Sequence, residues 1–280
     1  MFAASPASAT PATAPLSRAQ FASGVNLVEV YATVTDARGQ LVGALTADDF
    51  AITEDGVAQP IAAFAAGEFP VAVALGIDCS FSVPPAALAR VKRAARAFVA
   101  ALRAGDQVMV IAIGGDVTVA SPLSNDHQKA LAAIDGVERW GSTPLRDAAV
   151  AAIGAIQHAG GRRALVLMSD GADRSSQSTL DQVVDEARRH DVLVYPIGTG
   201  RRQPPIFAAL ARVTGGRSFA APGGRALTRA LGDIARELRF QYLIGYAPPH
   251  GAGAPPRWRA IHVAVRRPGV RVRARDGYLR

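Results

Sequence analysis

One stretch of the chain ends an apolar run with a carboxylate and then places two hydroxyls at alternate positions. In VAVALGIDCSFSV, Asp78 is followed by Ser80 and Ser82. Alternate residues turn the same way where a chain leaves a β-strand, so these three side chains can converge on one point. Carboxylate and hydroxyl oxygens are hard ligands of the kind that Mg²⁺ prefers. The pattern predicts a cation site; the alternative is that the serines only cap the following helix.

Two later segments carry residues of the same chemistry. Thr143 lies in the loop RWGSTPL before a predicted helix, and Asp170 ends the strand-like run RRALVLMSD. Ligands of an open α/β sheet bind beside the carboxyl ends of its strands, so we expect both residues on the same edge as Asp78. The alternative for Asp170 is that it caps a turn. A soft-metal site is not expected, because the chain has one cysteine, Cys79, and its five histidines are scattered.

The elements that must position these residues follow from hydrophobic patterning. From about residue 70 to residue 240, apolar strand-like runs alternate with segments of helical spacing. This alternation predicts an α/β fold, a doubly wound and mostly parallel sheet with helices on both faces. Residues 25–69 and 241–280 instead read as β-strands. We expect them to complete one small antiparallel β domain, into which the α/β domain is inserted.

The ends and the bulk composition set further limits. Residues 1–24 are small residues and prolines without periodicity, so we expect disorder and no complete signal peptide. No apolar run approaches the roughly 20 residues that span a bilayer. The net charge is +8 in 280 residues, but no basic block is interleaved with aromatic residues, so nucleic acid is not expected. The arginines of residues 271–275 are interpreted as the solvated face of an edge strand, with an anion-binding patch as the alternative.

Three motifs together resemble a known family. DCSFSV, GSTPLRDA and VLMSDGAD are similar to the three parts of the metal-ion-dependent adhesion site of von Willebrand factor type A domains. The resemblance covers about residues 70–240 in element order as well as motifs. The flanking segments resemble those of a bacterial group, the VWFA-related Acidobacterial proteins.

The resemblance implies a role for each motif residue. Asp78 would hold the metal mainly through waters, Ser80 and Ser82 directly, and Thr143 and Asp170 directly or through water, depending on the conformational state. The expected ion is Mg²⁺, with Mn²⁺ or Ca²⁺ as alternatives. A sixth position would take an Asp or Glu carboxylate of a protein partner. The resemblance also implies export to the periplasm or cell exterior, and by analogy a movement of the last helix, residues 225–240.

Other residues of the motifs receive secondary roles. Many relatives read Asp-Thr-Ser-Gly-Ser, so Cys79 and Phe81 fill variable positions, and Phe81 is expected to form an apolar rim or to tighten the loop. Ser142 stands where relatives have glycine, and Asp147 is expected on a helix surface or just behind the ligands. We interpret Cys79 as a small buried filler. Two further aspartates, Asp116 and Asp173, are expected in turns or loops.

A hard-cation site of this kind could serve three classes of function. The first is a module that binds a partner carboxylate through the metal. The second is a structural or assembly component whose metal only stabilises loops. The third is a metal-dependent hydrolase, but Ser80 stands where a haloacid-dehalogenase-like phosphatase needs its second aspartate. The sequence also lacks a GxSxG elbow, a P-loop and an HExxH helix. The chain is therefore predicted to be a binding module and not an enzyme.

Overall fold

The computed structural model describes residues 27–67, 69–171, 173–200, 203–249 and 257–279. The predicted disorder of residues 1–24 lies outside this range.

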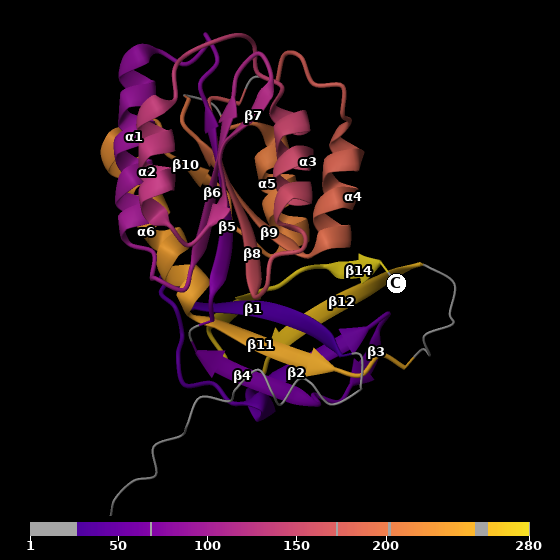
Figure 1. Ribbon diagram of the computed structural model, residues 1–280. Helices are drawn as coiled ribbons and strands as arrows, with labels where there is room; N and C mark the ends of the chain where they lie inside the picture. The colour runs from indigo at the N-terminus through magenta and orange to yellow at the C-terminus, as the bar shows by residue number, and fades with distance from the viewer. Residues whose placement is uncertain (1–26, 68, 172, 201–202, 250–256, 280) are drawn as a thin grey trace, which may run out of the picture.

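A six-stranded sheet forms the centre of the α/β region (Figure 1). Its strand order is β10-β9-β8-β5-β6-β7, and all neighbours are parallel except the edge pair β6 and β7. The strands are β5 (Val71–Asp78), β6 (Gln107–Ile113), β7 (Val117–Ser124), β8 (Arg162–Ser169), β9 (Val192–Gly198) and β10 (Phe219–Ala220).

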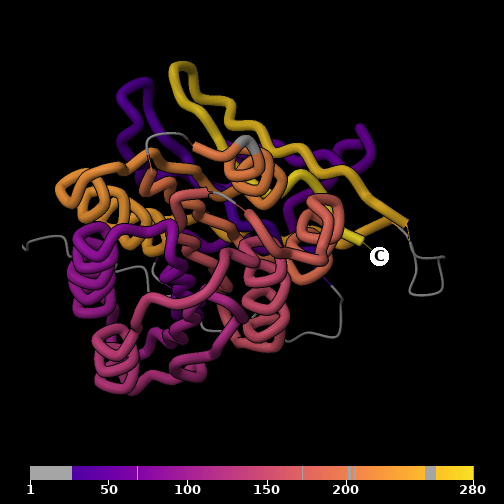
Figure 2. The backbone as a smooth tube through the Cα atoms, turned by 90° about the horizontal axis from the view of Figure 1, so that it is seen from above, coloured from indigo at the N-terminus to yellow at the C-terminus, as the bar shows by residue number. Residues whose placement is uncertain are grey.

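Helices cover both faces of this sheet, as predicted. One face packs against α1, α2 and α6, and the other against α3, α4 and α5; the view from above shows the two groups on opposite sides (Figure 2). No helix in the described residues is long and apolar enough to cross a membrane. The helices are α1 (Pro85–Ala100), α2 (His127–Gly136), α3 (Leu145–Ile156), α4 (Leu180–His190), α5 (Pro205–Thr214) and α6 (Gly224–Arg239).

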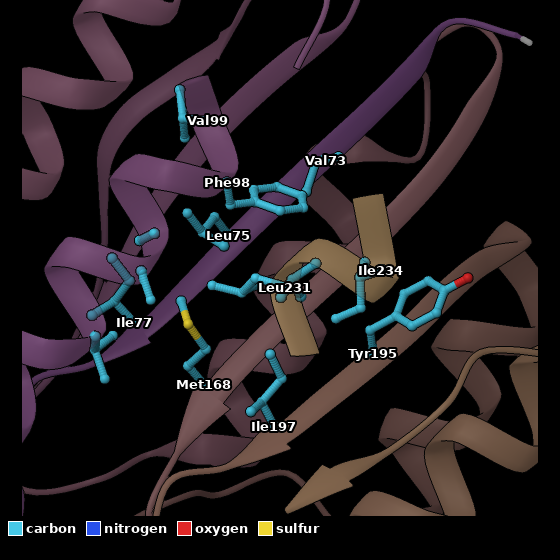
Figure 3. Packing of buried hydrophobic residues seen from close by; sticks show 14 of the residues in the cluster. Val73, Leu75, Ile77, Phe98, Val99, Met168, Tyr195, Ile197, Leu231 and Ile234 are labelled. Atoms are coloured by element: carbon cyan, nitrogen blue, oxygen red, sulfur yellow. The ribbon is translucent and has the colours of Figure 1, made fainter. Parts of the chain in front are cut away.

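The composition of β5 explains its central place. All of its residues are buried, and its larger side chains alternate with small ones. Val73, Leu75 and Ile77 point to the face that α1 and α6 cover (Figure 3). Ala74 and Gly76 lie on the opposite face, where a Cβ on Gly76 would already be 3.0 Å from the Leu167 side chain. Strands buried on both faces are typical of parallel sheets, and the small residues leave room for α3.

Strands from both ends of the chain pair with one another in antiparallel sheets. The β1–β11 register pairs Val30 with Ile244, and the β2–β12 register pairs Ile52 with Val263. This confirms the predicted joining of the two ends, but the described residues form two four-stranded sheets, β13-β1-β11-β4 and β14-β12-β2-β3. Their elements are β1 (Val28–Asp36), the 3-10 helix η2 (Ala47–Asp49), β2 (Phe50–Glu54), β3 (Val57–Gln59), β4 (Ala63–Gly67), β11 (Gln241–Tyr246), β12 (Trp258–Val265), β13 (Val270–Arg273) and β14 (Gly277–Leu279).

The C-terminal strands differ from the prediction in one respect. The sequence around Pro268 and Gly269 predicts two strands joined by a turn. The turn is present, with Gly269 at a φ of +75°, but β12 and β13 enter different sheets and a third strand, β14, follows. The hydrophobic core between the sheets includes Phe50, Ile52 and Tyr246, and it is shielded from solvent only when strands from both chain ends cover it.

A buried arginine connects the α/β region to these sheets. Arg162, the first residue of β8, is fully buried. Its guanidinium donates to the backbone oxygen of Leu238 at the end of α6, to Gln241 Oε1 in β11 at 3.1 Å, and to the Gly67 oxygen at the end of β4 at 3.3 Å. Both chain connections are therefore held at the amino end of β8, so the carboxyl ends of the parallel strands lie on the edge away from the antiparallel sheets (Figure 1).

Candidate metal site

The candidate site is built on Asp78, the last residue of β5, which is 2% exposed. Its Oδ1 accepts hydrogen bonds from the Ser80 backbone N–H at 3.0 Å and from Ser80 Oγ at 2.7 Å, and its Oδ2 accepts one from Ser169 Oγ at 2.5 Å. Burial raises the pKa of the Asp78 carboxyl, and the charge of Asp170 raises it further, whereas the bonds from Ser169 and Ser80 lower it. A buried carboxylate that is held in this way lacks a compensating positive charge in these contacts.

The three predicted hydroxyls form one chain of contacts beside this carboxylate. Thr143 Oγ1 donates to Ser80 Oγ at 2.8 Å, and Ser80 Oγ lies 3.0 Å from Ser82 Oγ. Ligand oxygens at the 2.0–2.1 Å that Mg²⁺ requires are about 2.9 Å apart along the edges of an octahedron. The spacing of the hydroxyl oxygens therefore fits adjacent ligands of one such ion.

The alternative role of the serines, capping the next helix, is not what the structure shows. The residue before α1 is Pro84, and no side chain makes a capping hydrogen bond there. Ser80 instead turns inward and is 1% exposed, while Ser82 is exposed. The hydroxyls are thus directed to Asp78 and to each other, with Ser82 at the solvent side.

The loop that carries Thr143 is held against the loop after β5. The Trp140 N–H donates to the Cys79 oxygen at 3.0 Å, and the Phe81 N–H donates to the Gly141 oxygen at 3.1 Å. Gly141 has a φ of +63°, and a Cβ there would lie 2.2 Å from the Cα of Gly115. The close approach requires glycine at this position and fixes Thr143, which is fully buried, beside Ser80.

Asp170 follows β8 directly and is half-buried. Because β8 is the parallel neighbour of β5, the two acids lie on the same sheet edge, and the charge of Asp170 adds to the effect of burial in raising the pKa of Asp78. The sequence patterns did not single out Ser169, the preceding residue, although its hydroxyl contacts Asp78 and also accepts the Gly171 N–H at 2.9 Å. The only signal for it was a hydroxyl at a strand end beside a candidate ligand.

Two aspartates outside the cluster hold the neighbouring loop. Asp147, in the first turn of α3, accepts the N–H groups of Gln177 at 3.0 Å and Ser178 at 2.8 Å. Asp173 pairs with Arg146 at 3.1 Å. Burial alone would raise the pKa of both carboxyls, but these hydrogen bonds outweigh it and lower both values. Their carboxylates are therefore committed to loop contacts.

The rim of the site is partly aromatic. Phe81 is 64% exposed, and the Arg139 guanidinium lies 5.8 Å from the centre of its ring and donates to its backbone oxygen at 2.6 Å. Cys79, between the first two motif residues, is fully buried, and burial raises the pKa of its thiol to about 11, so it is a filler and not a reactive thiolate. Ser142 is half-buried on the same loop as Thr143.

The donor set determines which ion fits. The described residues contain no group of three or more His, Cys, Asp or Glu side chains placed to hold a metal. The motif cluster instead combines two carboxylates with three hydroxyls, a combination suited to a hard cation that keeps waters or takes an outside ligand. Ser82 is exposed and Asp170 is half-buried, so a water or an outside ligand could reach the cation from the solvent side.

Comparisons with known proteins agree with this architecture. Residues 73–172 match the family profile described as von Willebrand factor type A domain. A von Willebrand factor type A structure from Catenulispora acidiphila aligns with a TM-score of 0.55 and 14% identity over 80% of this chain and 71% of that one. No sequence among the curated proteins matches the chain.

Two further structures are similar in fold. Proximal thread matrix protein 1 from the mussel byssus, with a zinc-occupied MIDAS motif, aligns with a TM-score of 0.53 and 17% identity over 65% of this chain and 48% of that one. An aerotolerance-related membrane protein from Bacteroides fragilis aligns with a TM-score of 0.50 and 16% identity over 60% of this chain and 98% of that one. At these identities the likeness concerns the fold alone.

Proposed function

Since residues 73–172 match the profile of the von Willebrand factor type A domain, we propose that the chain is a protein-binding module that holds a partner's Asp or Glu carboxylate through a divalent cation. The observation that carries the proposal is the contact chain from Thr143 through Ser80 to Asp78, with Ser82 at its solvent end. A module of this kind binds and does not catalyse.

Each residue has a distinct part in the proposed site. Asp78 supplies negative charge from a buried position, and Asp170 supplies it from the other strand end. Ser80, Ser82 and Thr143 supply neutral oxygens. Two carboxylates leave Mg²⁺ without an excess of negative charge around it, so the bound ion can still attract a carboxylate from outside. The zinc in the mussel protein's MIDAS motif supports a divalent ion at such a site, and Mn²⁺ or Ca²⁺ are alternatives.

The rim gives the proposed site its selectivity. An exposed aromatic ring and a guanidinium stand together at Phe81 and Arg139, next to the loop that carries the hydroxyls. Aromatic and arginine side chains are enriched among residues that dominate protein interfaces. A partner acid at the metal could be flanked by an apolar residue that contacts Phe81 and by a second acid that pairs with Arg139.

The setting of the module is proposed from the chain as a whole. Residues 70–240 form the binding domain, and residues 25–69 with 241–280 form a second domain that carries it. Export to the periplasm or cell exterior is supported by the resemblance of the flanking segments and by a membrane protein among the structures of similar fold.

The first experiment measures the ion. Isothermal titration with Mg²⁺ is expected to show one site in the wild type and none in Asp170→Asn. Asp185→Asn, an exposed aspartate on α4 away from the motifs, is the matched control and should bind like the wild type. Equal Mg²⁺ binding by all three proteins would contradict the assignment of the site.

The second experiment measures the partner chemistry. Arrays of peptides in matched pairs, Asp against Asn and Glu against Gln, are probed with the protein in Mg²⁺ and in EDTA. We expect binding to acid peptides that EDTA abolishes. A protein whose melting temperature rises with Mg²⁺, but which binds no acid peptide in preference to its amide, would instead be a structural component with a stabilising metal.

A further inference from the structure

A second candidate site lies at the junction between the α/β region and the antiparallel sheets. A cleft of about 1310 Å³ opens between the last turns of α6, the loop after β1 and strand β13. Its lining includes residues at the end of α6 that leads into β11, and this end of α6 lies next to the antiparallel sheets, away from the metal-site edge (Figure 1). The volume exceeds the roughly 300–1,000 Å³ of ordinary small-molecule pockets, so an extended ligand fits it better.

The charge of this junction cleft is unbalanced. Among the described residues, the arginines that line it outnumber the carboxylates. The charged lining residues are Arg38, Arg217, Arg236, Arg271, Arg273, Asp233 and Glu237.

Both carboxylates are already engaged. Glu237 is 3% exposed and accepts from Tyr195 Oη at 2.9 Å and from Arg273 at 2.6 Å. Asp233 pairs with Arg236 and, at 3.9 Å, with Arg217. The two carboxylates of the cleft therefore contact Arg217, Arg236 and Arg273, and neither contacts Arg38 or Arg271.

Arg38 and Arg271 are the two arginines of the lining that lack a carboxylate partner among the described residues. Both are exposed, and within the described part of the chain neither guanidinium makes an ion pair or hydrogen bond. Arg38 contacts Asp36 only through its backbone N–H, at 2.8 Å. Two free guanidiniums that face one cleft are suited to carboxylates, which they bind by paired hydrogen bonds.

The lining also includes apolar side chains. Phe240 is 54% exposed, and Leu41, Val42 and Val272 line the same cleft. A polymer of phosphates would leave these surfaces without contacts, whereas a peptide has side chains of both kinds. We propose that the junction cleft binds an acidic peptide segment of a partner protein that also carries apolar side chains.

The two longer segments of the chain outside the described residues do not fit as the occupant. Residues 1–26 and 250–256 contain no aspartate or glutamate. These two segments therefore cannot supply carboxylates to pair with Arg38 and Arg271. The site is also separate from the metal site, because its lining shares no residue with the motif cluster.

Fluorescence anisotropy with the full chain tests this proposal. The probe is a short fluorescein-labelled peptide that alternates glutamate with leucine. We expect Arg38→Glu combined with Arg271→Glu to weaken binding by at least about tenfold. The matched control, Arg93→Glu combined with Arg229→Glu, makes the same change in net charge at exposed arginines of α1 and α6 outside the lining, and should stay within about twofold.

Other outcomes would overturn it. Equal weakening by the two double variants would show a response to net charge, and an unbound probe would show that the cleft does not take such peptides. Inorganic polyphosphate that displaces the probe, together with no loss when serine replaces leucine, would show a general polyanion site. Binding should persist in EDTA and in Asp170→Asn, so failure of the metal site and failure of this cleft are distinguishable.

Discussion

Two buried charged side chains stand at opposite ends of the neighbouring strands β5 and β8. Asp78 ends β5 and is 2% exposed, while Arg162 begins β8 and is fully buried. Asp78 is surrounded by hydroxyls, which can donate a hydrogen bond or instead present an oxygen to a cation. Arg162 is surrounded by oxygen acceptors that only a donor satisfies.

The two buried charges also differ in their access to solvent. The hydroxyls at Asp78 lead outward to exposed Ser82. The guanidinium of Arg162 lies over the rings of Phe69, at 4.7 Å, and Tyr31, at 5.5 Å, and is closed off. Burial lowers the pKa of Arg162 to about 10, so it stays charged at neutral pH. The contacts of Asp78 therefore allow it to exchange hydrogen-bond donors for a cation, whereas those of Arg162 permanently attach the α/β region to the antiparallel sheets.

The largest expected effect concerns the attachment. Arg162→Met should lower the free energy of unfolding by about 3 kcal/mol, because it leaves buried acceptors from α6, β4 and β11 without a donor. Urea denaturation at neutral pH measures it. Arg163→Met is the control: this half-buried neighbour donates to Gln157, and its loss should cost less than about 1 kcal/mol. Equal costs would remove the distinction between the two arginines.

The next effect concerns the hydroxyl cluster beside Asp78. Thr143→Val should weaken Mg²⁺ binding by at least about tenfold, since it replaces a ligand oxygen in the proposed site with a methyl group at nearly constant volume. Thr143→Ser retains the hydroxyl and should keep most of the affinity. Titration calorimetry compares the three proteins. An unchanged affinity in the valine variant would mean that Thr143 only positions Ser80.

A smaller effect concerns the loop that supports Thr143. Arg174, next to Asp173, donates its N–H to the Thr143 oxygen at 3.0 Å. Asp173→Asn should cost about 0.5 kcal/mol at neutral pH, because it weakens the contact with Arg146. The pKa of Asp173 is lowered in the folded state, so the stabilisation is present above the usual value of 3.8 and is lost as the pH falls through the lowered pKa. Urea denaturation across acidic pH should show the two proteins converging; a constant difference would rule out the charge as its cause.

The smallest effect concerns the rim. Phe81→Ala should change the free energy of unfolding by less than about 0.5 kcal/mol, because the ring is 64% exposed. Mg²⁺ affinity should stay within about threefold, while the set of bound acid peptides changes. Calorimetry and the peptide arrays measure both. A large loss of Mg²⁺ affinity would show that the ring shapes the cage itself.

Much of the fold could be predicted because it depends on local patterns. The alternation of apolar strands with amphipathic helices is visible in the sequence, and so are helix starts such as Thr179, which accepts the Gln182 N–H at 3.2 Å. The number of antiparallel sheets could not be predicted. The turn at Gly269 is the same whether its two strands pair or separate, and only the burial of both sheets' inner faces decides between them.

The candidate site divides in the same way. The sequence by itself determined which oxygens are available, since Asp78, Ser80 and Ser82 follow one strand at alternate positions and Asp170 ends another. Only the tertiary structure decided that Thr143 contacts Ser80, that Ser169 joins the cluster, and that Asp147 is committed to the loop at residues 177–178. Spacing along one strand is a local property of the backbone. Contacts between strand ends and loops instead depend on how the whole sheet packs.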